Sequence, residues 1–200
     1  LREFPREVGV LLFASFFVAV GFGIIAPTLP LFARSFGVNN AQVGSIISAF
    51  ALARFASGLI SGKLVDKFGE RAVYSVGIGM VAISSAAAAA AQSYSQLLIF
   101  RAAGGLGSSM FSVAAGSLLL RVTADHQRCR AQSLYNGSFL LGMVGGPVIG
   151  GALSGFSLRA PLAIYAFLLV ISSISAGFLL KGSALAAKPT NTSEKTSLRD

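Results

Sequence analysis

Six stretches of the sequence are apolar and long enough to cross a lipid bilayer as helices. Bilayer hydrocarbon is about 30 Å thick and a helix rises about 1.5 Å per residue, so a span needs roughly 20 mainly apolar residues. The stretches lack the alternation of barrel strands, and a helix satisfies its own backbone groups in lipid. We therefore expect an all-α membrane protein with six transmembrane helices near residues 8–33, 43–62, 72–91, 95–121, 131–156 and 160–180.

The composition argues against a soluble protein, since 54% of the residues are hydrophobic, only 12% are charged and the mean hydropathy is +0.74. The net charge of +9 does not indicate nucleic-acid binding, because the basic residues lie between apolar runs and not together on one solvated face. One histidine and one cysteine do not make a catalytic set. The sequence therefore indicates no enzyme, no cofactor and no metal site.

Lysine and arginine gather at one end of the expected helices. Basic residues near the ends of spanning helices are retained on the cytoplasmic side, so their distribution predicts orientation. The opposite end carries only Arg34 and Arg159. We therefore expect both termini to be cytoplasmic. The basic end holds Arg2, Arg6, Lys63, Lys67, Arg71, Arg121, Arg128, Arg130, Lys181 and Lys188.

The sequence divides into two parts. Residues 1–181 contain all six apolar stretches, whereas residues 182–200 are polar and poor in large apolar groups, as expected of a solvated cytoplasmic linker. The chain begins with Leu1 and has no signal peptide before the first apolar stretch. We expect an excerpt or a processed chain, with a further segment after the linker.

A short charged segment, residues 62–71, separates the second and third apolar stretches. Gly62 and Gly69 permit the tight reversal that a ten-residue connection between antiparallel helices requires. Asp66 can pair with a neighbouring cation or cap a helix N-terminus, a contact worth about 0.3–1 kcal/mol when exposed. Such a contact can form in one conformation and break in another. A solvated turn that only obeys the positive-inside rule is the alternative. The cations of this segment are Lys63, Lys67 and Arg71.

Arg101 lies within the fourth apolar stretch. A guanidinium inside a spanning helix costs roughly 2.5–3.5 kcal/mol on insertion scales unless it finds partners, so it should face protein or water. Gly105 lies one turn further along the same face and leaves room for a neighbouring helix or for water. The alternative is an arginine near the helix end whose side chain extends to the membrane surface.

The fifth stretch contains glycines at steps of four residues, Gly142, Gly146 and Gly150. Such spacing makes a bare stripe against which another helix can pack closely. Pro147 removes a backbone donor beside the stripe, so we expect the helix to bend there. A bend beside a smooth stripe could act as a pivot in a moving protein. Static packing, the common role of small residues in membranes, is an equal alternative.

The first stretch ends in the segment 21–30, where we expect Pro27 and Pro30 to kink or stop the helix. With this segment, four patterns in order resemble motifs of the major facilitator superfamily. The second-to-third-helix motif, G-x-L-a-D-r-x-G-r-k, is matched by Gly62, Leu64, Asp66, Lys67, Gly69 and Arg71, with Glu70 where a cation is usual. The R-x-x-x-G-x-G motif is matched by Arg101, Gly105 and Gly107. The antiporter motif G-x-x-x-G-P-x-x-G-G is matched by Gly142, Gly146, Pro147, Gly150 and Gly151.

The resemblance implies the N-terminal half of a twelve-helix drug and proton antiporter, built from inverted repeats of three plus three helices. It implies that the segment at Asp66 gates the cytoplasmic side, with Asp125 as a second acid for Arg71. It associates the Arg101 motif with proton coupling. The implied partners are the lipid bilayer, a small-molecule substrate, protons and a C-terminal six-helix half in the plasma membrane.

Arg54 in the second stretch is not explained by the motifs. By the same cost argument it should point into the bundle, where it could bind an anionic group, partner an acid, repel cations or serve packing. Phe22, Tyr135 and Asn136 are further candidates for the cavity wall, although core packing is the alternative for each. No Asp or Glu lies inside an expected span, so the proton-carrying acid would lie at a helix edge or in another part of the protein.

Efflux is therefore the function that the sequence favours. A uniporter or symporter of the same superfamily, moving another small solute, is the main alternative. A helical membrane scaffold without transport would explain the hydropathy and the glycine stripe. It would give no reason for the ordered motifs.

Overall fold

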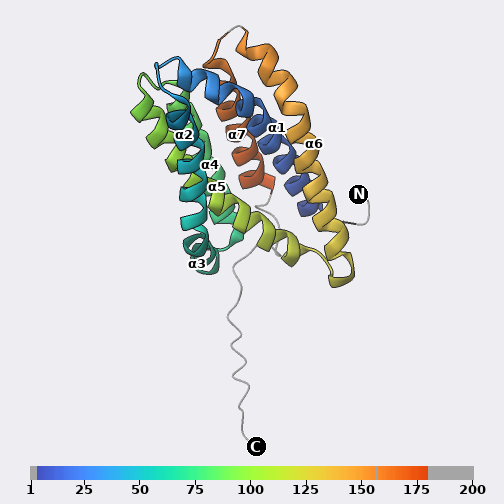
Figure 1. Cartoon of the computed structure of the whole chain (residues 1–200). Coiled ribbons are helices and arrows are strands. Elements are labelled where there is room, and N and C mark those ends of the chain that lie inside the picture. The colour runs from blue at the N-terminus through green and yellow to red at the C-terminus, as the bar shows by residue number, and fades with distance from the viewer. Residues whose placement is uncertain (1–3, 156, 180–200) are drawn as a thin grey trace, which may run out of the picture.

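The computed structural model describes residues 4–155 and 157–179, and these residues form a bundle of helices that run alternately up and down (Figure 1). The expected linker, residues 182–200, lies outside the described residues. The elements are α1 (Arg6–Arg34), α2 (Asn40–Ala56), α3 (Gly58–Phe68), α4 (Glu70–Ala89), α5 (Tyr94–Val122), the 3-10 turn η1 (Asp125–Gln127), α6 (Arg128–Ser154) and α7 (Ala160–Leu179).

The expected all-α membrane fold is confirmed. Helices α1, α4, α5, α6 and α7 begin and end within three residues of the expected bounds. Among the described residues, α1, α4, α5 and α6 are each long and apolar enough to cross a membrane, and the pair α2 and α3 makes a fifth span. Helix α7 is apolar over Ala160–Ile174 and packs against α1 and α4.

The second span is broken, which the sequence analysis missed. Its two parts, α2 and α3, meet at Ser57 with a bend of 46°. The Ser57 hydroxyl donates to the carbonyl oxygens of Ala53 at 2.7 Å and Arg54 at 3.2 Å. A serine that bonds back to the preceding turn competes with the helical ladder and bends the helix, and Gly58 directly after it weakens the helix further.

The expected ten-residue turn at residues 62–71 is wrong. Helix α3 continues through this segment to Phe68, and α4 begins at Glu70. The reversal is made by Gly69 alone, with φ 83° and ψ 154°, a conformation that side chains disfavour. Gly62 lies inside α3, where a side chain would meet nothing within 4 Å, so a tight approach is not the reason for this glycine.

Helix α1 does not stop at its prolines, contrary to one of the two expectations for them. Pro27 and Pro30 lie inside the helix, which runs on to Arg34. Each proline removes one N–H from the ladder. The buried Thr28 hydroxyl donates to the carbonyl oxygens of Ile24 at 3.2 Å and Ile25 at 3.1 Å, so polar groups beside the prolines are satisfied within the helix.

The spans contact one another in a symmetrical pattern. When α2 and α3 are taken as one span, the first three spans end with α4 and the last three begin with α5. The first span of each triplet packs on the middle span of the other triplet, α1 on α6 and α5 on α2, while the third spans, α4 and α7, pack together. An inverted repeat of three plus three helices has this pattern.

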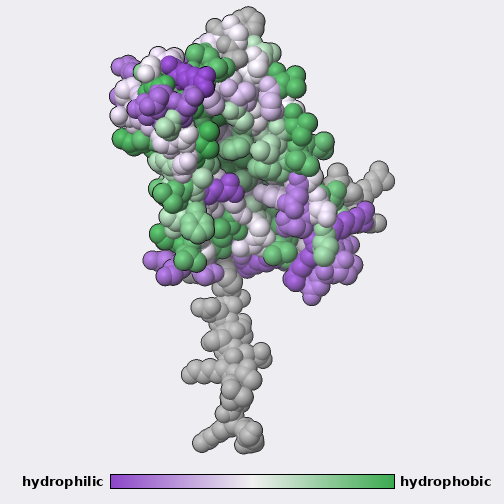
Figure 2. Space-filling view, viewed as in Figure 1, coloured by the Kyte–Doolittle hydropathy of each residue, from purple (hydrophilic) through white to green (hydrophobic). Residues whose placement is uncertain are grey.

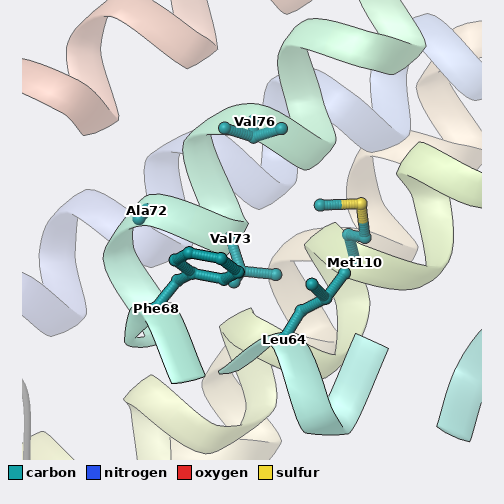
Figure 3. A pocket seen from close by; sticks show the side chains of 6 residues that line it. All are labelled: Leu64, Phe68, Ala72, Val73, Val76 and Met110. Carbon is teal, nitrogen blue, oxygen red and sulfur yellow. The ribbon is translucent and has the colours of Figure 1, made fainter. Parts of the chain in front are cut away.

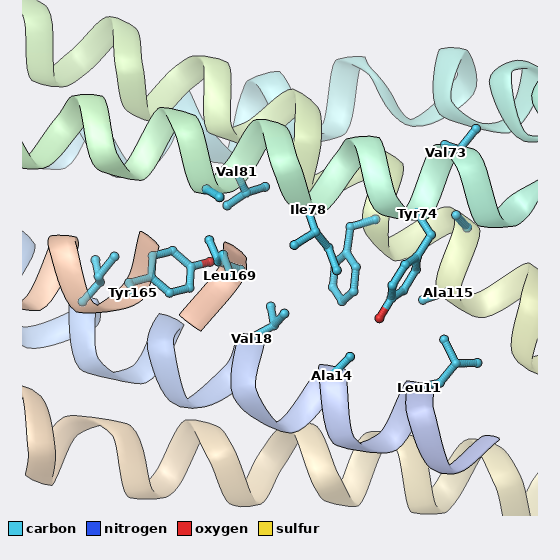
Figure 4. Packing of buried hydrophobic residues seen from close by; sticks show 14 of the residues in the cluster. Leu11, Ala14, Val18, Val73, Tyr74, Ile78, Val81, Ala115, Tyr165 and Leu169 are labelled. Carbon is cyan, nitrogen blue, oxygen red and sulfur yellow. The ribbon is translucent and has the colours of Figure 1, made fainter. Parts of the chain in front are cut away.

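The buried core lies where α1, α4, α5 and α7 meet (Figure 4). Leu11, Ala14 and Val18 project from α1 into this core, and Ala14 lies opposite Tyr74 of α4, as Figure 4 shows. The Tyr74 ring packs against Phe111 of α5, with the ring centroids 5.2 Å apart. Each helix therefore buries one face against the others, and the outer faces of the bundle stay apolar.

Charged groups gather toward the ends of the bundle. On the face shown in Figure 2, hydrophilic residues cluster near both ends and hydrophobic residues fill most of the band between them. The joint between α3 and α4 and the turn between α5 and α6 lie at the lower end in Figure 1, together with the start of α1. The chain is a multi-pass membrane protein with this polarity.

Candidate transport site

At the lower end of the bundle, an ion pair joins two consecutive spans. The Arg121 Nη1 atom, in the last turn of α5, donates to Glu70 Oε2 in the first turn of α4 at 2.7 Å. Glu70 is buried, and its negative charge lies at a helix N-terminus, where the helix dipole favours an acid. Glu70 is the residue that departs from the family motif, so the departure is also the acid of the ion pair.

The motif acid Asp66 is exposed, and it forms no ion pair with any residue that the structure describes. Asp125, the expected second acid for Arg71, instead pairs with Arg128 at 2.9 Å within η1 and the start of α6. Lys63 and Lys67 are also exposed, and the ammonium of Lys67 lies 5.3 Å from the Phe68 ring centroid.

The motif residue Leu64 packs inward. It lines an apolar pocket of about 290 Å³ between α3, α4 and α5, opposite Met110 (Figure 3). Phe68 lies beside Val73 of α4 in the same pocket, and Val76 lines it further along α4. The segment therefore combines an apolar side that holds α3 on the bundle with a charged side that carries Asp66.

Arg101 is buried within α5, as the insertion-cost argument predicts. Its guanidinium carbon lies 4.7 Å from the Phe50 ring centroid of α2, a cation–π contact. Nε and Nη1 make no hydrogen bond to any described residue. Arg101 lines a small pocket of about 210 Å³ together with Phe22 of α1 and Phe50. Arg101 is therefore a desolvated cation, and its Nε and Nη1 atoms have hydrogen-bond donors that the described residues do not use.

The two glycines of the Arg101 motif pack against different helices. A side chain at Gly105 would collide with the Phe50 carbonyl of α2 and would lie 3.0 Å from the Ala53 Cβ atom. A side chain at Gly107 would lie 2.6 Å from the Gly77 carbonyl oxygen of α4. The space at Gly105 and Gly107 is therefore filled by neighbouring helices, and the motif fixes α5 between α2 and α4.

The glycine stripe of α6 packs against α1, as close packing of a small-residue stripe requires. Gly142, Gly146 and Gly150 are buried, whereas every residue between them is exposed. The Cα atom of Gly23 on α1 lies 2.5 Å from the place of a Cβ on Gly146. Gly151 belongs to the motif but faces open space. The motif therefore makes one continuous seam between α1 and α6, and the exposed Pro147 borders it next to Gly23.

Arg54 lies at the midpoint of the bent second span and is exposed. Its Nη2 atom donates to the Ser112 hydroxyl of α5 at 3.0 Å. Arg54 and Ser112 line both a pocket of about 200 Å³ and an adjoining groove of about 840 Å³. The other residues of the smaller pocket are Val18, Phe22, Ser108, Phe111, Phe139, Met143 and Tyr165.

Two of the four expected cavity residues come together here. Phe22 lines the Arg54 pocket and the Arg101 pocket, so it separates the two cations. Tyr135 is half-buried on α6 and lies outside the walls of these pockets. Asn136 is exposed and accepts a hydrogen bond from Gln132 Nε2 at 3.1 Å along its own helix.

The sequence analysis missed Ser112 and the pairing of Glu70 with Arg121. A signal for the ion pair exists, because opposite charges lie at the same end of two consecutive antiparallel spans. A signal for Ser112 is weaker, since serine is common in α5 and only the packing of α2 on α5 selects one hydroxyl. Among the described residues, no cluster of His, Cys, Asp or Glu could hold a metal ion.

The sequence matches a known protein family over most of its length. A model of the Major Facilitator Superfamily matches residues 11–199. The chain belongs to the major facilitator superfamily. Members of this superfamily are transporters and not enzymes, in agreement with the sequence analysis.

Curated relatives in the superfamily carry names that refer to drug resistance. The chain is 27% identical over 172 residues to the quinolone resistance protein NorA of Staphylococcus aureus. The matched region covers 83% of the chain and 44% of that protein. It is 24% identical over 179 residues to multidrug resistance protein 2 of Bacillus subtilis, covering 89% of the chain and 45% of that protein. The chain therefore spans about half the length of these relatives.

Solved structures share the fold. The crystal structure of the human organic anion transporter MFSD10 has a TM-score of 0.75 at 18% identity, over 86% of the chain and 47% of that structure. A peptide transporter POT in complex with sulfate has a TM-score of 0.82 at 18% identity, over 93% of the chain and 40% of that structure. The major facilitator fold of the bundle is confirmed, and the bundle covers less than half of each of these two solved structures.

Proposed function

We propose that this chain is the N-terminal half of a proton-coupled exporter of small, drug-like molecules in the plasma membrane. The observation that carries the proposal is the seam between Gly23 of α1 and Gly146 of α6, beside Pro147. Its glycine and proline pattern resembles the drug and proton antiporter motif. The names of the two curated relatives, which refer to quinolone and multidrug resistance, favour the same function.

The substrate path of this proposal lies between this half and a C-terminal six-helix half. The Arg54 pocket is lined by residues of α1, α2, α5 and α6, so these four helices would form one wall of a central cavity. Substrate binds near the membrane midplane and the halves rock around it. Large apolar side chains exposed on α2 and α6 would contact lipid or the second half, among them Leu52, Phe55, Leu141, Val144 and Val148.

The gate at the cytoplasmic side would use the charges around the joint between α3 and α4. Asp66 is exposed and free to meet a partner in another conformation, while the Glu70–Arg121 pair holds the ends of α4 and α5 together. Gly146 and Pro147 would let α6 bend against α1. The termini are cytoplasmic in this scheme, because the lower end carries most of the basic residues.

Proton coupling would involve Arg101. Its buried, partly unbonded guanidinium can respond to the charge of a nearby group more strongly than an exposed one, because the surroundings have a low dielectric constant. The acidic side chains of the described residues, Glu7, Asp66, Glu70 and Asp125, all lie at helix ends. The titrating acid would therefore be one of these or belong to the second half.

Everted membrane vesicles that contain the full-length protein test the proposal. An imposed pH gradient, acidic inside, should drive a fluorescent quinolone into the vesicles, and a protonophore should stop the uptake. Movement of the same compound without dependence on the gradient would point to a uniporter. Movement in the opposite direction with protons would point to a symporter. Absence of movement above empty vesicles would overturn the assignment as a quinolone exporter.

A further inference from the structure

Arg54 differs from the other arginines of the described residues in its position. It lies at the midpoint of its span, far from both ends, yet it is exposed toward a pocket and a groove. Arg101 is also within a span, but it is buried beneath the Phe50 ring. A cation that is both central and accessible can meet a molecule that enters the cavity.

The hydrogen bonds of Arg54 leave most of its donors unused. A guanidinium carries five N–H donors, and among the described residues Arg54 donates a hydrogen bond to the Ser112 hydroxyl. It forms no ion pair with any described residue, since the acids of that part of the chain lie at the helix ends. A neutral hydroxyl does not neutralise the charge, so Arg54 keeps its positive charge and most of its N–H donors available to an anion.

The walls around Arg54 define the rest of such an anion. Phe22, Phe139 and Met143 give the pocket an apolar surface. Ser108 also lines it, and the Ser112 hydroxyl lies within hydrogen-bond distance of the guanidinium. Arginine binds carboxylates and related groups through two parallel hydrogen bonds, and a hydroxyl can donate to the same oxygen. The pocket combines one anion-binding point with a surface suited to aromatic or aliphatic groups.

We propose that Arg54 binds the anionic group of the transported molecule, so that the substrates are amphipathic carboxylates or sulfonates with an apolar body. This inference rests on the proposed transport function and names its substrate class. A purely cationic compound is disfavoured, because its charge would lie near Arg54 in surroundings of low dielectric constant.

Three probes of the same size test the charge preference, namely 2-naphthoate, 2-naphthamide and 2-naphthylmethylammonium. Their equilibrium binding to the purified full-length protein in detergent is measured for the wild type and for the Arg54→Gln and Arg54→Lys variants. The wild type should bind naphthoate best. Arg54→Gln should weaken naphthoate binding by about tenfold or more, as expected for a lost charge-assisted hydrogen bond, and leave naphthamide unchanged. Arg54→Lys should retain part of the preference.

Arg34→Gln is the matched control, because it removes the same charge from an exposed site at the end of α1, away from the pocket and groove that Arg54 lines. It should bind the three probes like the wild type. Equal binding of naphthoate and naphthamide by the wild type, or no binding of any probe, overturns the proposal. Equal weakening of all probes in Arg54→Gln also overturns it and indicates that Arg54 pairs with an acid of the second half.

Vesicle transport separates this inference from the proposed function. If the wild type binds naphthoate selectively through Arg54 but a pH gradient moves none of the probes, the anion site stands and proton-driven export fails. If the gradient drives the ammonium probe and naphthoate does not bind, export stands and the anion site fails. Each result therefore contradicts one of the two statements and leaves the other.

Discussion

Glu70 and Arg121 form an ion pair of 2.7 Å that joins the first turn of α4 to the last turn of α5. The acid is almost fully buried and the arginine is partly buried, so water screens the pair less than it screens an exposed one. The pair lies at the hairpin ends that are furthest from the connection between α4 and α5. The ion pair therefore holds together the two helix ends that no loop connects directly.

We predict that Glu70→Gln lowers the free energy of unfolding by about 1–3 kcal/mol, because it removes the charge of the acid to which Arg121 donates its charge-assisted hydrogen bond. Thermal unfolding of the protein in detergent measures the effect. Arg121→Gln should give a similar loss, and the double variant should lose less than the sum. The exchanged pair, Glu70→Arg with Arg121→Glu, should recover part of the stability. Simple additivity of the two single changes would contradict the interaction.

Gly146→Ala should destabilise the protein by about 1–3 kcal/mol, the usual range for overpacking, because the added methyl group would lie 2.5 Å from the Gly23 Cα atom. Gly145→Ala is the matched control on the same helix, since a Cβ there meets nothing within 4 Å. It should change stability by less than about 0.5 kcal/mol. Thermal unfolding of both variants checks the difference. Equal effects would mean that the seam tolerates a side chain.

Arg101→Met should lower proton-driven transport strongly without lowering stability. A buried cation with unbonded Nε and Nη1 atoms is unfavourable in the folded state, and an apolar side chain of similar length removes that penalty. The unfolding midpoint should stay level or rise while pH-gradient-driven uptake into vesicles falls. A variant that transports like the wild type would exclude Arg101 from coupling. A marked fall in stability would assign Arg101 a packing role.

Asp66→Asn should reduce the transport rate several-fold while the protein still inserts at wild-type levels. Asp66 is exposed and forms no ion pair with the described residues, so the change should not disturb the bundle. Immunoblots of membranes measure insertion, and initial rates in vesicles measure transport. Asp66→Glu, which keeps the charge, should restore part of the rate. An unchanged rate in Asp66→Asn would reject the gating role.

The helices and their order could be predicted because hydropathy alone fixes where a chain can cross a bilayer. The glycine stripe at Gly142, Gly146 and Gly150 was also visible, since spacing defines a helix face. Its partner α1 was not predicted, because spacing does not say which of several helices meets that face.

Local chemistry explains the two errors in the second span. The expected turn rested on Gly62, but a glycine also fits inside a membrane helix, and Gly69 alone reverses the chain. The bend at Ser57 depends on a hydrogen bond from its hydroxyl to the Ala53 carbonyl oxygen. The sequence shows the serine but not the acceptor of its hydrogen bond. The Glu70–Arg121 pair depends on how α4 and α5 are aligned, a relationship between residues far apart in the chain.

The seam between α1 and α6 also bears on how the protein is made. Helix α1 leaves the ribosome before α6, the helix with which it shares its most extensive contact, and α6 follows only after three more spans. Until then, α1 must remain in lipid without that partner. Its buried hydroxyls are satisfied before α6 arrives, because those of Ser15 and Thr28 donate hydrogen bonds to carbonyl oxygens of α1 itself. The Gly23 face of α1 can therefore stay vacant during synthesis without an unpaired hydroxyl group in the membrane.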